Sequence, residues 1–459
     1  MAMRYDEFFR SVEGKCVAVC GIGHNNLSVI YQLLAHRARV IACDKRTREQ
    51  LGAAAEELEV AGATLCLGED YLEHLEPASL ILRTPGMKPY LPQFKAARAA
   101  GKTVTSEMEL FFELCPAPVY AVTGSDGKTT TTTVIAGLLA KAGETVHLGG
   151  NIGNPMLPAI EKVTDDDKAV VELSSFQLTM MTQSPQVAVV TNVAPNHLDW
   201  HTDMKEYIDA KRNLVMHQRA GDRAVLNADN VHTAAFAADC PGEVWWFSRL
   251  HPVERGAYLG EDGVLYITDG EVTVPVLPAS EILIRGVHNI ENYLAAFAAT
   301  YGVVPVEVMA EYARTFGGVA HRCELVREHG GVKWYNDSIG SSPSRTIAGL
   351  EAFDRKVILI AGGYDKHIPY DPLGPVAAKT VKHAVLLGAT APAIEAVLKR
   401  DTDVPITRVA SMEEAVAAAA ALATDGDIVF LSPASASFDM YKNFEERGNH
   451  FKKLVQELS

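Results

Sequence analysis

The sequence predicts an α/β protein with three domains, each built around a mainly parallel sheet. The chain has 459 residues, too many for one hydrophobic core, and 48% of them are apolar. Short apolar runs alternate with turns and helical stretches. This pattern restarts at Pro116-Ala117-Pro118 and again after Gly317-Gly318. We therefore expect domains over residues 1–115, 116–318 and 319–459.

The first block begins like a Rossmann-like domain. A strand at 16–20 leads into Gly21-Ile22-Gly23, a helix is expected over 27–36, and a strand over 40–43 follows. A dinucleotide fingerprint would carry a third glycine at Asn26, and its absence weakens an NAD interpretation. A purely structural turn and a ligand site both remain open here.

Two further features of this block could meet a ligand. Asp44 ends the second strand and suits a ribose hydroxyl, whereas Lys45 and Arg46 suit a phosphate. A strand at 80–82 precedes the turn 84–86, whose amides would lie at the carboxyl ends of the sheet.

The strongest chemical signal is T-G-S-D-G-K-T-T at residues 123–130, between an apolar strand at 119–122 and a helix that includes 134–139. Its glycines let backbone amides face phosphate oxygens, Lys128 supplies a cation, and the Thr129 hydroxyl can bind magnesium. The first glycine of the common P-loop is replaced by Val122, so the motif is shorter. The alternative is a glycine turn with an ordinary surface lysine. We expect a triphosphate site in a central P-loop-type ATPase domain with a parallel sheet.

Polar residues also follow two later strands of the central block. Glu172 ends a strand at 169–172, where a nucleotide-bound magnesium ion needs a carboxylate. His197 follows a strand at 187–191. Alone it would be a structural histidine, but beside a triphosphate loop we favour a metal ligand.

Helices of the central block add three candidates. Lys211 alone would be a solvated surface charge. Asn289 and Asn292 are three residues apart in a helix expected over 289–301, so both amides can meet an adenine edge. Helix capping by Asn289 is the alternative. Turns at 260–263 and 269–270 predict hairpins attached to the main sheet.

The third block is predicted to be a C-terminal Rossmann-like α/β domain, with strands at 357–360, 384–387 and 428–431.

Bulk composition excludes several classes of partner. The formal net charge of −15 argues against nucleic acid and anionic membranes. The seven cysteines are odd in number and scattered, which is typical of reduced thiols. We see no signal peptide and no stretch of about twenty apolar residues, and we expect a cytoplasmic monomer.

Together these motifs resemble the Mur ligases of bacterial cell-wall synthesis. The resemblance rests on the T-G-x-x-G-K-T loop, Glu172, His197 and the Asn289/Asn292 pair. Similarity to the members that add D-glutamate rests on G-G-N-I-G-N-P at 149–155, E-L-S-S-F-Q at 172–177 and L-S-P-A-S-A-S-F-D at 431–439. That last run continues into K-N-F-E-E-R-G at 442–448. The motifs extend in order over essentially the whole chain.

The resemblance implies an N-terminal domain that binds a UDP-substrate, a central ATP-binding domain and a C-terminal amino-acid-binding domain. It places the ATP-binding positions on Gly124, Ser125, Asp126, Gly127, Lys128, Thr129, Thr130, Asn289, Asn292, Arg322 and Asp337. It places the UDP-substrate contacts on His24, Asn25, Asp44, Lys45, Thr84, Gly86 and Asn151. The D-glutamate contacts would be Ser341, Lys366, Ser437 and Phe444.

The catalytic residues carried over from the family are Lys128, Glu172, His197 and Lys211, and the metal ligands are Thr129, Glu172, His197 and Lys211. Two magnesium ions and a carbamylated Lys211 are implied, since a carbamate turns a cation into an anionic ligand. The chain departs from the family at Ile339, where lysine is common, and at Asn26 in the first turn.

The implied reaction is the ATP-dependent addition of D-glutamate to UDP-N-acetylmuramoyl-L-alanine through an acyl phosphate, a cytoplasmic step of peptidoglycan synthesis. A folylpolyglutamate synthase or the L-alanine-adding Mur ligase is the nearest alternative. An NAD-dependent oxidoreductase, suggested by Gly21-Ile22-Gly23, leaves the Lys128 loop unexplained. A non-catalytic nucleotide-binding subunit would not need Glu172, His197 and Lys211 together.

Overall fold

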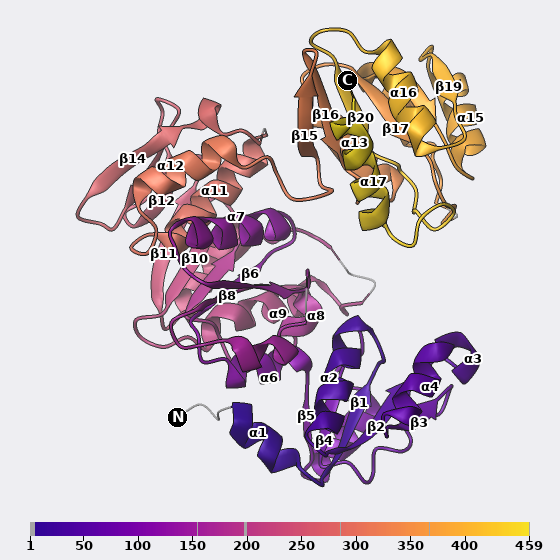
Figure 1. The fold of residues 1–459 in the computed structure, drawn as a ribbon. Coiled ribbons are helices and arrows are strands. Elements are labelled where there is room, and N and C mark those ends of the chain that lie inside the picture. Colours follow the sequence, from indigo (N-terminus) through magenta and orange to yellow (C-terminus); the bar gives the residue numbers. More distant parts are fainter. Residues whose placement is uncertain (1–4, 154, 197–199, 285, 367, 459) are drawn as a thin grey trace. The chain divides into compact units, whose positions relative to one another are not determined.

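The computed structural model describes residues 5–153, 155–196, 200–284, 286–366 and 368–458, apart from the side chains of His24 and Asn25. The chain divides into two compact units, Met1–Ile282 with Val287–Arg314, and Leu283–Gly286 with Thr315–Ser459. The first unit contains a five-stranded and a nine-stranded sheet, and the second a six-stranded sheet (Figure 1). The three-domain α/β architecture is thus confirmed.

The N-terminal sheet has the order β3-β2-β1-β4-β5, and all its neighbouring strands are parallel. Strand β1 is buried along its whole length, as expected for a strand covered on both faces. The strands are β1 (Cys16–Cys20), β2 (Arg39–Asp44), β3 (Thr64–Leu67), β4 (Leu80–Arg83) and β5 (Thr103–Thr105). The helices are α1 (Tyr5–Val12), α2 (His24–Ala35), α3 (Arg48–Leu51), α4 (Ala53–Val60), α5 (Pro92–Ala99) and α6 (Glu107–Leu114).

The central sheet has the order β14-β13-β12-β11-β10-β9-β6-β8-β7. It is parallel from β7 to β12 and ends in the antiparallel pairs β12/β13 and β13/β14, which confirms the predicted hairpins. The strands are β6 (Val119–Thr123), β7 (Val146–Gly150), β8 (Lys168–Glu172), β9 (Val187–Val190), β10 (Arg223–Asn227), β11 (Glu243–Ser248), β12 (Gly256–Leu259), β13 (Val264–Thr268) and β14 (Thr273–Pro278).

The central region also contains helices, and those at 128–141, 204–216, 231–235 and 287–300 contact strands of this sheet. The helices are α7 (Lys128–Lys141), α8 (Ser175–Leu178), α9 (Met204–Met216), α10 (Val231–Ala235), α11 (Val287–Thr300) and α12 (Val306–Thr315), with short 3₁₀ helices η1 (Leu157–Lys162), η2 (Phe236–Asp239) and η3 (Ala279–Glu281). No helix in the described part of the chain is long and apolar enough to cross a bilayer.

The sheet of the second unit has the order β15-β16-β20-β17-β18-β19. The sequence analysis missed the antiparallel hairpin β15/β16, but the remaining pairs are parallel as predicted. The strands are β15 (Glu324–His329), β16 (Val332–Asn336), β17 (Val357–Ala361), β18 (Val381–Leu386), β19 (Ile406–Arg408) and β20 (Ile428–Leu431). The helices are α13 (Pro343–Glu351), α14 (Leu373–Thr380), α15 (Ala391–Asp401), α16 (Met412–Leu422) and α17 (Phe444–Gln456).

Candidate active site

The phosphate loop follows β6 and ends where α7 begins at Lys128. Gly124 and Gly127 have φ of 155° and 78°, a region that side chains disfavour. A Cβ at Gly124 would lie 1.8 Å from Oγ1 of Thr191, and one at Gly127 would lie 2.4 Å from Oδ1 of Asn292. Both positions therefore require glycine. The loop opens the 14-residue helix α7, whose amino end favours an anion.

Two lysines donate to the same carbonyl of this loop. Nζ of Lys128 lies 3.0 Å from the carbonyl oxygens of Gly124 and Ser125, and Nζ of Lys211 lies 2.7 Å from that of Gly124. Lys211 is 1% exposed. Its burial, and then the charge of Lys128, hold its pKa well below the usual value. Lys211 therefore loses its proton more readily than an exposed lysine.

The sequence analysis did not assign a role to Tyr207, which contacts both the phosphate loop and Lys211. Its hydroxyl oxygen lies 2.8 Å from Oγ of Ser125, and its ring centroid lies 4.7 Å from Nζ of Lys211. Tyr207 lies one helical turn before Lys211 on α9. The signal in the sequence that could have found it is an aromatic residue four positions before a predicted site lysine on the same helix.

Glu172 is buried at the end of β8, and both of its carboxylate oxygens have partners. Oγ1 of Thr129 donates to Oε2 at 2.7 Å, and Nδ2 of Asn151 donates to Oε1 at 2.8 Å. The structure thus brings together three predicted site residues: Asn151 after β7, Glu172 at the end of β8 and Thr129 in the first turn of α7. Carboxylate, hydroxyl and amide oxygens are ligands that Mg²⁺ prefers.

The remaining predicted metal ligand, His197, lies outside the described residues. Within the described ranges no group of three or more histidine, cysteine or acidic side chains is placed to hold a metal ion. Mg²⁺ usually takes only one or two carboxylates and completes its shell with water and phosphate oxygens, so Thr129 and Glu172 still fit such an ion.

Asn289 and Asn292 share a face of α11, as predicted. Nδ2 of Asn292 donates to Oδ1 of Asn289 at 3.1 Å, and Oδ1 of Asn292 accepts a hydrogen bond from Oγ1 of Thr131 at 3.1 Å. Because α11 begins at Val287, Asn289 lies inside the helix and is not its N-cap. Asn292 therefore joins α11 to the start of α7, with Asn289 beside it.

The N-terminal sheet gathers its predicted ligand residues at one edge, because they follow β1, β2 and β4. The carboxylate of Asp44 accepts hydrogen bonds from the amide of Ile22 at 2.7 Å and from Arg46, whose Nε and Nη2 lie 3.0 and 2.8 Å away. Burial alone would raise the pKa of Asp44, but these hydrogen bonds outweigh it and lower the pKa. Arg46, noted in the sequence only as suited to a phosphate, thus fixes Asp44. Lys45 is exposed.

Asn26 explains the missing third glycine of this turn. Its side chain is 3% exposed, and Nδ2 donates to the carbonyl of Gly21 at 2.9 Å. The side chain stabilises the turn from inside. On the turn after β4, the carbonyl of Gly86 accepts a hydrogen bond from the indole of Trp200 at 2.9 Å.

In the second unit, the predicted residues follow the neighbouring strands β16, β20 and β17. Nζ of Lys366 lies 3.3 Å from Oγ of Ser341, which confirms that these two lie together. Lys366 is exposed, Phe444 is half-buried and Ser437 is 3% exposed. Phe444 begins α17.

Asp337 follows β16 and is buried. Oδ2 accepts a hydrogen bond from Oγ of Ser432 at 2.8 Å, and Oδ1 accepts one from the amide of Cys323 at 3.2 Å. Burial raises the pKa of Asp337 to about 6, although these bonds and the charges of Arg322 and Arg345 oppose it.

Arg447 was part of a motif but received no role from the sequence. It is 2% exposed. Its guanidinium donates to Oγ and the carbonyl of Ser338 at 3.0 and 2.8 Å, and to the carbonyls of Ser435 and Ala436 at 3.2 and 3.0 Å. It therefore ties the loop after β20 to the loop after β16.

Family profiles match most of the chain. The Mur ligase MurD-like N-terminal domain matches residues 15–106, the Mur ligase middle domain matches 122–300, and the Mur ligase glutamate ligase domain matches 321–435. Two curated relatives named UDP-N-acetylmuramoylalanine–D-glutamate ligase are similar over their full length. The one from Acetivibrio thermocellus is 53% identical and the one from Ruminiclostridium cellulolyticum 48%, each over 100% of both chains.

Solved structures support the fold. UDP-N-acetylmuramate-alanine ligase MurC from Thermotoga maritima has a TM-score of 0.56 at 16% identity, covering 96% of this chain and 99% of that one. The full-length identity of the curated relatives, together with the three profiles, decides the family. The chain belongs to the Mur ligase family.

Proposed function

We propose that this chain adds D-glutamate to UDP-N-acetylmuramoyl-L-alanine, with ATP as the source of energy. The observation that carries the proposal is the Thr129–Glu172 contact beneath the phosphate loop, in a chain whose full-length relatives are named as D-glutamate ligases. We further propose that the enzyme acts as a cytoplasmic monomer on small-molecule substrates.

The phosphate loop binds the triphosphate of ATP. Backbone amides at 124–130 and the start of α7 face the phosphates, and Lys128 leaves its carbonyl partners to meet them. Thr129 and Glu172 hold magnesium, and Asn289 and Asn292 lie on the base side. Asp337 and Arg322 of the second unit contact ribose and phosphate.

Lys211 becomes a carbamate and serves a second magnesium ion together with His197. Its neutral amine attacks carbon dioxide, a C–N bond forms and one proton leaves, so the product is an anion. Burial and the nearby Lys128 support this assignment, because they favour the unprotonated amine on which the attack depends.

The UDP-substrate lies along the carboxyl edge of the N-terminal sheet, at His24, Asn25, Asp44, Lys45, Thr84 and Gly86, with Asn151 on the muramoyl-alanine side. D-Glutamate contacts Ser341, Lys366, Ser437 and Phe444. The Lys366 ammonium suits a substrate carboxylate, and Ser341 lies beside it.

The reaction forms an amide in two steps. The carboxylate of the alanyl group attacks the γ-phosphorus of ATP, and ADP leaves. The amine of D-glutamate then attacks the acyl carbon, phosphate leaves and the nitrogen loses a proton. Bound magnesium lowers the cost of negative charge on the transferring group, while Lys128 and the loop amides position it.

The test is phosphate release from ATP by the full chain. We expect release only when UDP-N-acetylmuramoyl-L-alanine and D-glutamate are both present. Release without D-glutamate, or equal release with L-alanine or with a folate substrate and L-glutamate, would refute the proposal.

The carbamate has its own test. Lys211→Ala should lose most activity, and short carboxylic acids should restore part of it, because they replace the missing anion. Lys205→Ala is the matched control on the same helix, since that side chain is 82% exposed. An inactive Lys211→Ala enzyme that no short acid restores would contradict the carbamate.

A further inference from the structure

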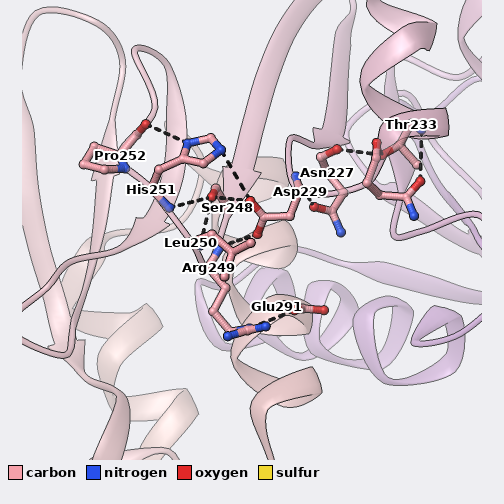
Figure 2. A network of polar contacts seen from close by, with 10 residues as sticks. Asn227, Asp229, Thr233, Ser248, Arg249, Leu250, His251, Pro252 and Glu291 are labelled. Carbon is pink, nitrogen blue, oxygen red and sulfur yellow. Dashed lines mark hydrogen bonds and ion pairs between the residues drawn. The ribbon is translucent and has the colours of Figure 1, made fainter.

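Arg249 lies in the turn after β11 and pairs with Glu291, the fifth residue of α11. Nε of Arg249 is 2.9 Å from Oε1 of Glu291, and the two side chains are 32% and 27% exposed (Figure 2). This ion pair joins a turn that no sequence motif singled out to the helix that carries Asn289 and Asn292.

Asp229 holds that turn in place. Its carboxylate accepts hydrogen bonds from Oγ of Ser248 at 2.6 Å and from the amide of Arg249 at 2.7 Å, and Nε2 of His251 lies 3.5 Å away. Figure 2 shows the side chains of Ser248 and His251 pointing toward Asp229. The hydrogen bond from the backbone amide of Arg249 to Asp229 fixes the residue whose side chain reaches α11.

The same network reaches the phosphate loop on its other side. Oδ1 of Asn227 accepts a hydrogen bond from the amide of Asp229 at 2.9 Å, and Nδ2 of Asn227 donates to the carbonyl of Thr191 at 2.8 Å. Oγ1 of Thr191 donates to the carbonyl of Asp126 in the loop at 2.6 Å. The turn after β11 is therefore tied both to the phosphate loop and to α11.

Glu291 anchors α11 without using the face of the two asparagines. Adjacent residues of a helix point about 100° apart, so Glu291 extends to the flank when Asn292 faces Thr131 and Gly127. The ion pair holds the amino-terminal half of α11 from the side. Asn289 stays beside Asn292.

We propose that Arg249 and Glu291, held by Asp229, are positioning residues that set Asn289 for recognition of the nucleotide base. The inference rests on the proposed function, which puts the base at Asn289 and Asn292. None of the three residues touches the triphosphate in this assignment. Their loss therefore weakens binding of the base and leaves binding of the phosphates unchanged.

The test compares magnesium-bound ATP with magnesium-bound inorganic tripolyphosphate by calorimetry on the full chain. Arg249→Ala should bind ATP about twofold to fivefold more weakly, the range for a partly exposed ion pair. Glu291→Gln should weaken ATP binding in the same direction, and Asp229→Asn should do so by releasing the turn. Tripolyphosphate affinity should not change. The charge reversal Arg249→Glu with Glu291→Arg should recover part of the loss.

Arg255→Ala is the matched control, because Arg255 pairs with Glu243 at 3.2 Å at the other end of the same strands. It should leave both affinities unchanged. Equal weakening of ATP and tripolyphosphate by Arg249→Ala would show a general structural role and overturn the inference.

Asn289→Ala separates this inference from the proposed function. A lower affinity of this variant for ATP, with that for tripolyphosphate unchanged, would support the base assignment. If Arg249→Ala and Glu291→Gln then change neither affinity, the positioning inference fails. If Asn289→Ala leaves ATP affinity unchanged, the base assignment itself fails and the inference falls with it.

Discussion

Asp337 should make the second unit lose stability as the pH rises, and Asp337→Asn should remove that loss. The carboxyl group is 6% exposed, and burial raises its pKa to about 6 from an ordinary 3.8. Between these values the folded protein holds a proton that the unfolded chain has released. Stability is thus fully present below pH 3.8 and declines as the pH rises through about 6.

The size of the decline follows from the shift. A difference of about 2.2 pKa units at about 1.36 kcal/mol each gives about 3 kcal/mol in the free energy of unfolding. Asparagine stays neutral and keeps one oxygen that can accept from Ser432 or Cys323. The stability of Asp337→Asn relative to wild type should therefore rise by about 2.5 kcal/mol from pH 4 to pH 7, because the rest of the change lies below pH 4.

Guanidinium unfolding at several pH values can measure this change. Trp334 reports on the second unit when the tryptophans of the first unit, Trp200, Trp245 and Trp246, are replaced by phenylalanine. Asp403→Asn, at an exposed position of the same unit, is the control and should keep the wild-type decline. A relative change below about 1 kcal/mol for Asp337→Asn would refute the argument.

Substitutions at three further sites test buried hydrogen bonds and the phosphate loop. Arg447→Ala leaves the buried carbonyls of Ser338 and Ser435 without their donor, while that of Ala436 still accepts from the amide of Tyr364. Unfolding of the second unit should therefore need at least about 2 kcal/mol less, whereas exposed Arg355→Ala should change little in denaturant titrations. Gly127→Ala forces a Cβ against Asn292 and should abolish ATP binding by calorimetry, while Gly143→Ala, which has open space, should bind normally. Glu107 is buried and accepts hydrogen bonds from the amides of Met156 and Leu157, and burial raises its pKa despite those bonds. In denaturant titrations at pH 7, Glu107→Gln should be at least as stable as wild type. Glu107→Ala, which leaves both amides without an acceptor, should be about 1–3 kcal/mol less stable.

Much of the site was predictable because the carboxyl ends of parallel strands lie along one edge of a sheet. Glu172 and the 123–130 loop are far apart in sequence, yet both were predicted at the carboxyl ends of strands in one parallel sheet, so their convergence was expected. The structure shows that convergence directly in the contacts of Glu172 with Thr129 and Asn151.

Residues that act through backbone groups were harder to find. Asn26 breaks the glycine pattern, but its side-chain amide donates to the carbonyl of Gly21. The guanidinium of Arg447 likewise donates mainly to backbone carbonyls. A carbonyl looks the same at every position of a sequence. A motif search therefore cannot tell which loop such a side chain will meet, whereas it readily finds a carboxylate at a strand end.

The electrostatic environment of Lys211 could not be predicted from the sequence either. In the sequence it is a lysine on a helix, for which a solvated charge is the ordinary interpretation. The fold places it 1% exposed and on the same Gly124 carbonyl as Lys128, which is 83 residues earlier in the chain. Burial makes the charged form of Lys211 costly, and the second ammonium group on the same carbonyl adds to that cost by repulsion. The lower pKa of Lys211 follows from this arrangement. The amine chemistry proposed for Lys211 thus depends on a long-range contact that local sequence patterns do not encode.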